Sequence, residues 1–372
     1  MDKKNKKIGS VLGLSIFFSI IAGGLAGVIG AVNVNESLNN YTRSLEEDTK
    51  FVTLSEIKPR PLPGTYEESL SRVREVAFTG VATVRAVSKD TKELSLMIKD
   101  DSMLGAGAVV TNDGWIVFNK ISFKKFTNPL TEAEVWIGGN RFAITNYVED
   151  TLTDLVMVKI ESKNLTSLAF GTSTGMNSGD LLFAIQNDQS VIIENIKNYR
   201  ARVGEVADPA EFFTTNWELE NKNPVGAPLF NTLAELVGIS TGEGGGIPLH
   251  QILPFIRSTI RDGVGSRAGL GVRVVEIDST LNIDESLLQN MTAGALVLNE
   301  SEVLAKSPAE LAGLEAGDII ISVDNKNIEK NMSLAELIAL HEVGDRGVLT
   351  VLRSGALISL EVTFTDFKDL KY

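Results

Sequence analysis

Charged side chains are absent from one long stretch near the start of the chain. Residues 8–32, IGSVLGLSIFFSIIAGGLAGVIGAV, carry none, and a helix of about 20 apolar residues spans the hydrocarbon core of a bilayer. A cleaved signal peptide is the alternative, but its apolar region is usually about 7–15 residues long and ends at a clear small-residue cleavage site. The longer run therefore predicts an uncleaved transmembrane anchor within residues 1–34.

The charges on either side of this run predict its orientation. Four lysines lie within residues 1–7, and the acidic residues that follow the run are Glu36, Glu46, Glu47 and Asp48. Lysine-rich flanks remain in the cytoplasm. We therefore expect a single-pass protein of the cytoplasmic membrane, with its N-terminus inside and the rest of the chain on the extracytoplasmic side.

A polar segment follows the apolar run. Residues 35–70 contain KPRPLPG, which concentrates three of the ten prolines of the chain. Proline fixes φ and lacks an amide hydrogen, so a segment of this kind forms a spacer rather than part of a core. The pattern predicts an extended tether over residues 35–70.

From residue 71 the apolar positions form many short runs, rich in β-branched and aromatic residues and separated by turn formers such as NDG and GGN. Short, closely spaced strands of this kind indicate an all-β barrel or sandwich. The pattern becomes helical in PLHQILPFIRSTIRDGV, and the sequence GEGGG at residues 242–246 predicts a flexible loop before that helix. A compact module of mixed helices and strands follows, so we divide this part of the chain into residues 71–263 and 264–368.

Composition excludes several kinds of chemistry. The chain has 372 residues, no cysteine and only two histidines, His250 and His341. No disulfide or thiol nucleophile is therefore present, and residues 1–249 contain no imidazole. The net charge is −13, and the chain beyond the basic residues 1–7 carries −16. Binding to nucleic acid needs a basic face, so we expect no nucleic-acid partner, and no motif indicates a metal site or a cofactor.

Four segments resemble the HtrA (Deg) family of trypsin-like serine proteases. GAGAVVTNDGWIVFNKISF is similar to the strands that lead to the family's catalytic His, and EDTLTDLVMVKI to the segment with the catalytic Asp, at Asp154. NKNPVGAPLFNTLAELVGIST resembles the nucleophile loop, and SPAELAGLEAGDIIISVDNKNI resembles the family's PDZ domain. The resemblance implies a mainly β fold, with a chymotrypsin/trypsin-like double β-barrel over residues 71–263 and an α/β-mixed PDZ domain over residues 264–368.

The residues that would perform catalysis are changed. Ile121 and Val225 occupy the positions that the resemblance assigns to the catalytic His and Ser, and neither side chain can donate or accept a proton. Asp154 is the only triad position retained, and we expect backbone N–H groups to hold its carboxylate instead of an imidazole. The oxyanion loop, at Asn223 and Val225 with Pro224 between them, is expected to be degenerate.

A lysine and a serine near Ile121 are candidates for a different nucleophile. Lys120 and Ser122 are two residues apart on an expected strand, so they would share one face of it. Ser–Lys dyads belong to other folds, and a solvated lysine is the favoured interpretation.

The resemblance to PDZ domains implies peptide binding. Such domains add an extended C-terminal peptide to a sheet edge and hold its carboxylate with backbone N–H groups. AGLGVRVVEI matches the carboxylate loop and places Leu270, Gly271 and Val272 there. A helix is expected at SLAELIALHEV, residues 333–343, and it adds Leu337 and His341 to the groove. Packing within the domain core is the alternative role for these residues.

Two functions are consistent with these residues. One is a membrane-tethered pseudoprotease that binds C-terminal or unfolded peptide segments through its PDZ domain, in envelope protein quality control or its regulation. The other is an active serine-type endopeptidase that uses an unrecognised nucleophile. The resemblance also implies a homotrimer or an assembly with active relatives, and YEESLSRVREVAF is the segment expected to supply contacts.

Overall fold

The computed structural model describes residues 64–87, 103–150, 152–174, 176–200, 216–221, 225–242, 244–280, 283–329 and 332–370. The predicted anchor and residues 35–63 of the predicted tether lie outside these ranges. Within the described ranges, no helix is long and apolar enough to cross a membrane. The anchor and its orientation therefore stay predictions.

A helix begins inside the segment expected to be an extended tether. Helix α2, Tyr66–Gly80, is capped by Thr65, whose side chain accepts a hydrogen bond from the Glu68 N–H at 3.2 Å. Its first turn is acidic, which complements the positive end of the helix dipole. The expected extended conformation is therefore wrong from residue 66 onwards, because local capping favours a helix there. Val73 and Ala77 pack into a core cluster with side chains of both barrels.

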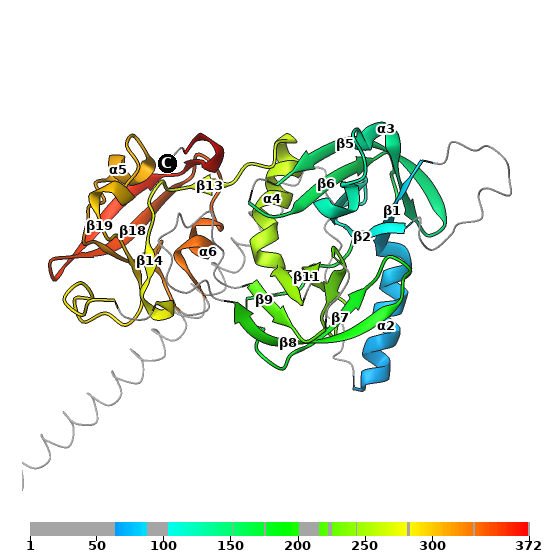
Figure 1. The fold of residues 1–372 in the computed structure, drawn as a ribbon, viewed down its shortest axis with the longest axis horizontal. Coiled ribbons are helices and arrows are strands. Elements are labelled where there is room, and N and C mark those ends of the chain that lie inside the picture. The colour runs from blue at the N-terminus through cyan, green and yellow to red at the C-terminus, as the bar shows by residue number, and fades with distance from the viewer. Residues whose placement is uncertain are drawn as a thin grey trace, which may run out of the picture. The chain divides into compact units, whose positions relative to one another are not determined.

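Six antiparallel strands close a first barrel, in the order β1-β2-β3-β6-β5-β4 (Figure 1). The predicted Asn–Asp–Gly turn joins β2 to β3, where Gly114 has a φ of +109° and Thr111 Oγ1 accepts a hydrogen bond from the Trp115 N–H at 2.9 Å. A short helix, α3 (Pro129–Glu132), precedes β4. The strands are β1 (Val81–Ala86), β2 (Met103–Val109), β3 (Trp115–Asn119), β4 (Ala133–Ile137), β5 (Asn140–Glu149) and β6 (Leu155–Ile160).

A second barrel closes in the order β10-β11-β12-β9-β8-β7, so the expected pair of β-barrels is confirmed. The prediction of a flexible loop at GEGGG is wrong. Gly242 and Gly244 have φ of +80° and +78° at a turn, and strand β12 follows that turn. At Gly245 an added Cβ would lie 2.2 Å from Thr241 Oγ1, so a larger residue there would require the exposed Thr241 side chain to move. The strands are β7 (Leu181–Ile185), β8 (Val191–Arg200), β9 (Asn216–Leu219), β10 (Pro228–Phe230), β11 (Leu236–Gly242) and β12 (Gly245–Pro248).

The expected helix after the second barrel is present as α4, Leu249–Asp262, which ends at Gly263 with a φ of +74°. The C-terminal module then forms a sheet in the order β14-β15-β16-β18-β19, with β17 paired to β16 and β13 paired to β20. Helix α5 packs against β19 and α6 against β16. The elements are β13 (Ala268–Gly269), β14 (Val275–Glu276), η4 (Ile277–Ser279), β15 (Ala295–Leu296), η5 (Glu300–Glu302), α5 (Pro308–Ala312), β16 (Ile319–Val323), β17 (Lys326–Asn327), α6 (Leu334–Ile338), β18 (Arg346–Arg353), β19 (Ala356–Thr363), β20 (Thr365–Asp366) and η6 (Phe367–Asp369).

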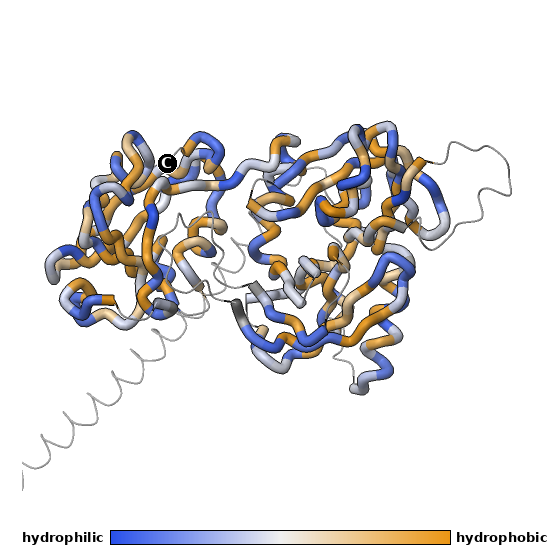
Figure 2. The backbone as a smooth tube through the Cα atoms, viewed as in Figure 1, coloured by the Kyte–Doolittle hydropathy of each residue, from blue (hydrophilic) through white to orange (hydrophobic). Residues whose placement is uncertain are grey.

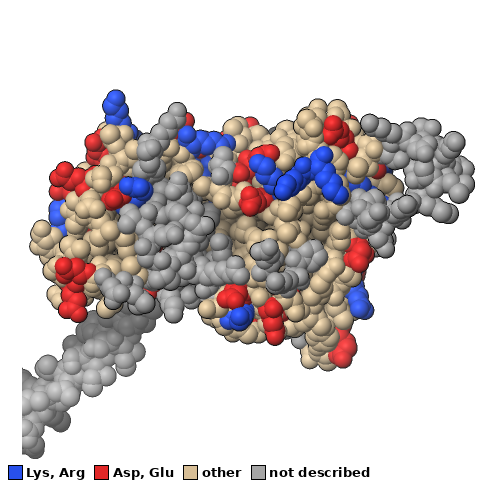
Figure 3. Space-filling model, viewed as in Figure 1, with Lys and Arg blue, Asp and Glu red and all other residues tan. Residues whose placement is uncertain are grey.

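Hydrophobic residues concentrate along the strands of both barrels and of the C-terminal module (Figure 2). They form separate clusters inside the first barrel, inside the second barrel and inside the C-terminal module. On the face of the molecule in Figure 3, acidic and basic side chains lie beside one another.

The helix expected over residues 333–343 is shorter than predicted. Helix α6 ends at Ile338, and a turn follows it.

Candidate functional site

Ile121 and Val225 line one cavity. Its volume is about 220 Å³, and the side chain of Ile121 is 52% exposed. Among the described residues of the lining, Asn187 has the one polar side chain, and none of them supplies an acid, a base or a nucleophile. Its other lining residues come from both barrels: Leu104, Gly105, Ala106 and Ala227.

Strand pairing in the first barrel brings Ile121 next to Asp154. Strand β3 pairs with β6, and just beyond the paired residues the Lys120 N–H donates to the Asp154 carbonyl oxygen at 2.7 Å. The chain then turns into a short 3-10 helix, η3 (Lys120–Phe123), which Asn119 caps by accepting a hydrogen bond from the Ile121 N–H at 2.9 Å. This turn places Ile121 at the cavity.

Two glycines determine where Val225 lies. Gly226 has a φ of +85°, and an added Cβ there would meet Asn119 Cβ of the first barrel at 3.0 Å. At Gly242 an added Cβ would lie 2.4 Å from Val225 Cγ2. The backbone at Gly242 therefore packs closely against the Val225 side chain, and the backbone at Gly226, the next residue, packs closely against the first barrel. Asn223 and Pro224, the rest of the predicted oxyanion loop, lie outside the described residues.

The carboxylate that the fold holds in place is not that of Asp154. Asp154 is exposed, and its side chain accepts no hydrogen bond from the described residues, so the expected pairing with backbone N–H groups is wrong. Asp150 has such partners instead: it accepts hydrogen bonds from the Leu152 N–H at 3.3 Å and the Thr153 hydroxyl at 2.6 Å. The Arg267 guanidinium also binds Asp150, with Nε at 2.9 Å, and both side chains are buried.

The shared strand face expected for Lys120 and Ser122 is also wrong. Both residues lie in η3, which has about three residues per turn, so side chains two residues apart diverge. Lys120 forms an ion pair with Glu149 at the surface, whereas Ser122 is buried and its hydroxyl has no hydrogen-bond partner among the described residues. This arrangement is incompatible with a Ser–Lys dyad.

In the expected carboxylate loop, some backbone N–H and C=O groups pair with residues 302–304, and those of Val272 point to the opposite side. Gly271 has a φ of +76°, and its carbonyl oxygen accepts a hydrogen bond from the Leu304 N–H at 2.9 Å. The Arg273 N–H donates to the Glu302 carbonyl oxygen at 2.8 Å. Because successive peptide groups of a strand point to opposite sides, the N–H and C=O of Val272 are directed away from this pairing.

The apolar residues of the expected groove pack in the core of the C-terminal module. Leu270, Val272 and Leu337 are fully or almost fully buried in one cluster. His341 lies beyond the end of α6, with its Nδ1 3.0 Å from the Leu337 carbonyl oxygen and its Nε2 2.8 Å from an Asp324 carboxylate oxygen. Both ring nitrogens of His341 therefore have partners within the module.

The sequence analysis missed the contacts of the other histidine. His250 lies in the first turn of α4, and its Nδ1 is 2.8 Å from the Ser173 hydroxyl while its Nε2 is 3.1 Å from a Glu336 carboxylate oxygen. Serine, histidine and a carboxylate are the side chains of a catalytic triad, but Ser173 is only 4% exposed and does not line the cavity of Ile121. Ser173 and His250 are 77 positions apart in the sequence, so no local pattern could have indicated this contact.

Comparisons with known proteins match both parts of the chain. Residues 268–364 match the family model described as PDZ domain. A probable periplasmic serine endoprotease DegP-like of Chlamydia muridarum is 31% identical over 280 residues, which cover 71% of this chain and 54% of that protein. Serine endoprotease DegS of Haemophilus influenzae is 26% identical over 325 residues, which cover 82% of this chain and 90% of that protein. The chain is an HtrA-like, trypsin-fold protease homologue with a C-terminal PDZ domain.

A solved structure supports the fold of this HtrA-like chain. HtrA-type protease AlgW with decapeptide has a TM-score of 0.55 and 23% identity, and the match covers 81% of this chain and 98% of that one. At this identity the likeness concerns the fold alone. The HtrA-like chain spans about half the length of the DegP-like relatives that it matches.

The PDZ domain of the HtrA-like chain contains a carboxyl group with a shifted pKa beside helix α6. Glu276 Oε1 accepts a hydrogen bond from the Leu334 N–H, the first of α6, at 3.1 Å. Burial raises the pKa of the Glu276 carboxyl from 4.5 to about 8; the hydrogen bond from Leu334 opposes this rise, and the charges of Asp278 and Glu336 add to it. Glu276 is thus a group that changes charge near neutral pH.

Proposed function

We propose that this HtrA-like chain is a membrane-tethered pseudoprotease that binds C-terminal or unfolded peptide segments through its PDZ domain, in envelope protein quality control or its regulation. The observation that carries the proposal is the cavity of Ile121 and Val225. A serine protease needs a nucleophile and a base at such a site, and the residues described in the lining of this cavity supply neither. The sequence offers no histidine before His250 to act as that base.

The geometry of the carboxylate loop supports peptide binding. Gly271 adopts a φ of +76°, and an added Cβ there would lie 2.4 Å from Ser307 Cβ, so only glycine suits this turn. The turn directs the Val272 peptide group away from its pairing partners, as recognition of a terminal carboxylate requires. Two similar structures of AlgW are described as containing a decapeptide and a tripeptide, which also favours a peptide ligand for this chain.

The proposed location is the extracytoplasmic side of the cytoplasmic membrane. The uncharged run of residues 8–32 would anchor the chain, with the four N-terminal lysines inside. The DegP-like relatives are named as periplasmic endoproteases, which agrees with that side. A homotrimer or an assembly with active relatives remains part of the proposal, with helix α2 as a segment for contacts.

An active endopeptidase with an unrecognised nucleophile is the alternative. The pair of Ser173 and His250 has the right side chains for it, but the hydroxyl is buried, and it also accepts a hydrogen bond from the His250 backbone N–H at 3.0 Å. A hydroxyl committed to capping a helix in this way is poorly placed to reach a peptide carbonyl. The contact therefore favours a structural role for Ser173.

Covalent labelling separates the two functions. The whole chain, purified in detergent, should neither cleave casein nor react with a fluorophosphonate probe, because no hydroxyl in the cavity has a base beside it. Labelling that is abolished by Ser173→Ala would instead establish the endopeptidase. Labelling that Ser173→Ala leaves intact would point to another nucleophile and would equally contradict the pseudoprotease.

Peptide binding is tested with free C-terminal peptides that end in an apolar residue. We expect a micromolar Kd, about −8 kcal/mol. Amidation of the peptide C-terminus should weaken binding by about 1.5–3 kcal/mol, because it removes hydrogen bonds to a charged group. Gly271→Ala should abolish the difference between acid and amide peptides. Gly313→Ala is the matched control, since Gly313 also has a positive φ of +84° but an added Cβ would meet nothing within 4 Å. Equal calorimetric affinities of the wild-type chain for both peptides would contradict carboxylate recognition.

A further inference from the structure

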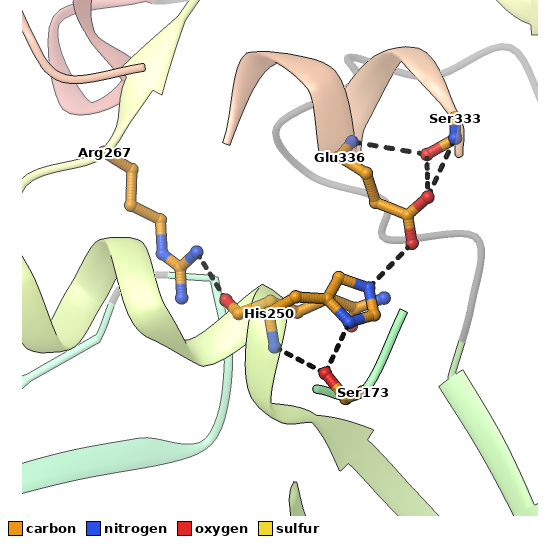
Figure 4. A network of polar contacts seen from close by, with 6 residues as sticks. Ser173, His250, Arg267, Ser333 and Glu336 are labelled. Carbon is orange, nitrogen blue, oxygen red and sulfur yellow. Dashed lines mark hydrogen bonds and ion pairs between the residues drawn. The ribbon is translucent and has the colours of Figure 1, made fainter. Parts of the chain in front are cut away.

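His250 joins helix α4 to helix α6 of the PDZ domain. Figure 4 shows its imidazole between Ser173 and Glu336, with one ring nitrogen directed at each. The side chain of His250 is 15% exposed and that of Glu336 is 2% exposed. A titratable pair is therefore largely buried at the contact between α4, which follows the second barrel, and α6 of the PDZ domain.

Glu336 also organises the start of its own helix. Its Oε2 accepts a hydrogen bond from the Ser333 N–H at 2.8 Å, and the Ser333 hydroxyl accepts one from the Glu336 N–H at 3.3 Å. This reciprocal capping box holds the first turn of α6. Because one carboxylate serves both the cap and His250, a change in the charge around Glu336 acts on α6 and on the contact with α4 together.

We propose that the His250–Glu336 pair is a pH-responsive latch between α4 and α6, tight at acidic pH and progressively loosened as the pH rises. When His250 is charged, both ring nitrogens donate hydrogen bonds, and the bond to Glu336 is an ion pair. When His250 is neutral, Nε2–H still donates to Glu336 while Nδ1 accepts from the Ser173 hydroxyl, but the bond is between a neutral donor and a carboxylate. Histidine ordinarily changes charge between pH 5 and 8.

A second carboxyl beside the latch changes charge at higher pH. Glu276 lies at the same end of α6, where it accepts a hydrogen bond from the Leu334 N–H. Burial raises the pKa of Glu276 to about 8, so its proton is lost as the pH passes through that value, and a negative charge then appears near Glu336. This charge repels Glu336, but it also strengthens the hydrogen bond that the Leu334 N–H donates at the positive end of α6. The loss of charge on His250 is therefore what weakens the latch, and Glu276 changes the charge around α6 at higher pH.

Other charged groups also lie around the latch. Arg267 donates to the carbonyl oxygen of Gln251, the residue after His250, at 3.0 Å and forms the buried pair with Asp150. At the other end of α4, Arg261 forms an ion pair with Glu342. The charge of Asp278 adds to the rise in the pKa of Glu276. The contacts of Arg267 and Arg261 hold the chain on either side of the latch.

Loosening the latch would reach the proposed peptide groove through α6, because Leu337 and Ile338 of this helix pack in the PDZ core with Leu270 and Val272. The latch itself does not require that peptides bind there. Its test therefore uses the chain without a peptide, so that failure of the latch and failure of peptide binding are distinguished.

The distance between the barrels and the PDZ domain measures the latch. The chain has no cysteine, so the double variant Lys163→Cys/Lys326→Cys places one spin label on each part at exposed positions. Double electron–electron resonance on the whole chain in detergent measures the distance between the two spin labels. It should give a single narrow distance distribution at pH 6, when the latch is closed, and a broader one at pH 9, when part of the chains are open. We expect the ratio of closed to open chains to fall by roughly fivefold, because an ion pair is replaced by a hydrogen bond from a neutral donor to a carboxylate; a fivefold change corresponds to about 1 kcal/mol, the upper value for ion pairs that retain some solvent contact.

Variants assign the change to its groups. His250→Gln keeps an N–H donor but cannot be charged, so the change with pH should disappear. Glu276→Gln removes the other titrating carboxyl and should leave the change that depends on His250 in place. His341→Gln, at the only other histidine, should also leave it intact. Distance distributions that do not depend on pH, or that respond equally in wild type and His250→Gln, would overturn the latch.

A second measurement covers the case in which His250→Gln does not fold. With two histidines in the chain, the His250 proton resonances are identified as those that persist in His341→Gln. In the wild type, the midpoint of the His250 titration should coincide with the midpoint of the distance change at the acidic end. A His250 resonance that titrates while the distance stays constant would equally overturn the proposal.

Discussion

Replacing Glu276 by glutamine should stabilise the PDZ domain, and the gain should grow as the pH rises. Glutamine is close in shape to glutamate, and its side-chain oxygen can still accept the hydrogen bond from the Leu334 N–H. It cannot ionise, so it avoids the cost of placing a charge in a buried site near Asp278 and Glu336. The substitution therefore removes one titration and leaves the packing of helix α6 in place.

The pKa shift of Glu276 determines the size of this effect. A carboxyl group with a pKa of about 8 in the folded protein and 4.5 in the unfolded chain binds its proton more tightly when folded. The stability that it contributes is fully present below pH 4.5 and is lost as the pH rises through about 8. The loss amounts to about 1 kcal/mol at pH 5, about 3 kcal/mol at pH 7 and about 5 kcal/mol at pH 9. These values are upper limits, because Glu276 retains some solvent contact.

Hydrogen exchange of the amides in strands β16 and β18 measures the opening free energy of the PDZ domain within the whole chain. Glu276→Gln should slow this exchange more at pH 8 than at pH 5, after correction for the intrinsic exchange rate. Glu285→Gln is the control, because Glu285 is exposed on the same module. A gain of the same size at both pH values, or no gain at either, would refute the reasoning that burial raises the pKa of Glu276.

Three further predictions follow from other parts of the chain. Arg267→Met should lower the free energy of unfolding by about 3–5 kcal/mol in urea titrations, because it leaves Asp150 buried without its counter-charge; Arg261→Met, at a more exposed pair, should cost less than about 1 kcal/mol, and equal losses would contradict this account. Val225→Ser should remain unreactive towards fluorophosphonates, because no imidazole lies in the cavity to activate the hydroxyl; labelling of the new serine would reveal an unrecognised base. Protease added to intact spheroplasts should digest the barrels and the PDZ domain, and full protection of both would contradict the predicted topology.

Local sequence patterns predicted short strands and turns and left a barrel or a sandwich open, and the resemblance to the HtrA family implied two barrels and a PDZ domain. Short β-branched runs separated by Asn, Asp and Gly predict strands and turns directly, because both preferences arise within a few residues. The same reasoning failed at α2 and β12. At α2, the prolines before Gly64 suggested an extended segment, whereas Thr65 caps a helix that begins at Tyr66. At β12, three consecutive glycines suggested a loop, whereas Gly245 and Gly246 form part of a strand.

The candidate site divides in the same way. The sequence by itself determined which side chains are available: an isoleucine and a valine where the resemblance expects catalytic residues, and no histidine before residue 250. That the two apolar residues share a cavity depends on β3–β6 pairing in one barrel and on Gly226 in the other.

Tertiary structure alone decided the roles of the charged residues. The retained Asp154 is exposed, whereas Asp150, four residues earlier, is buried against Arg267 of a distant segment. The sequence indicated only that His250 lies in a helix, whereas the folded chain places it between Ser173 and Glu336. A sequence states which groups can ionise, but burial and partners far along the chain set the energy of each charge. Those quantities exist only once the barrels have closed and the PDZ domain has formed.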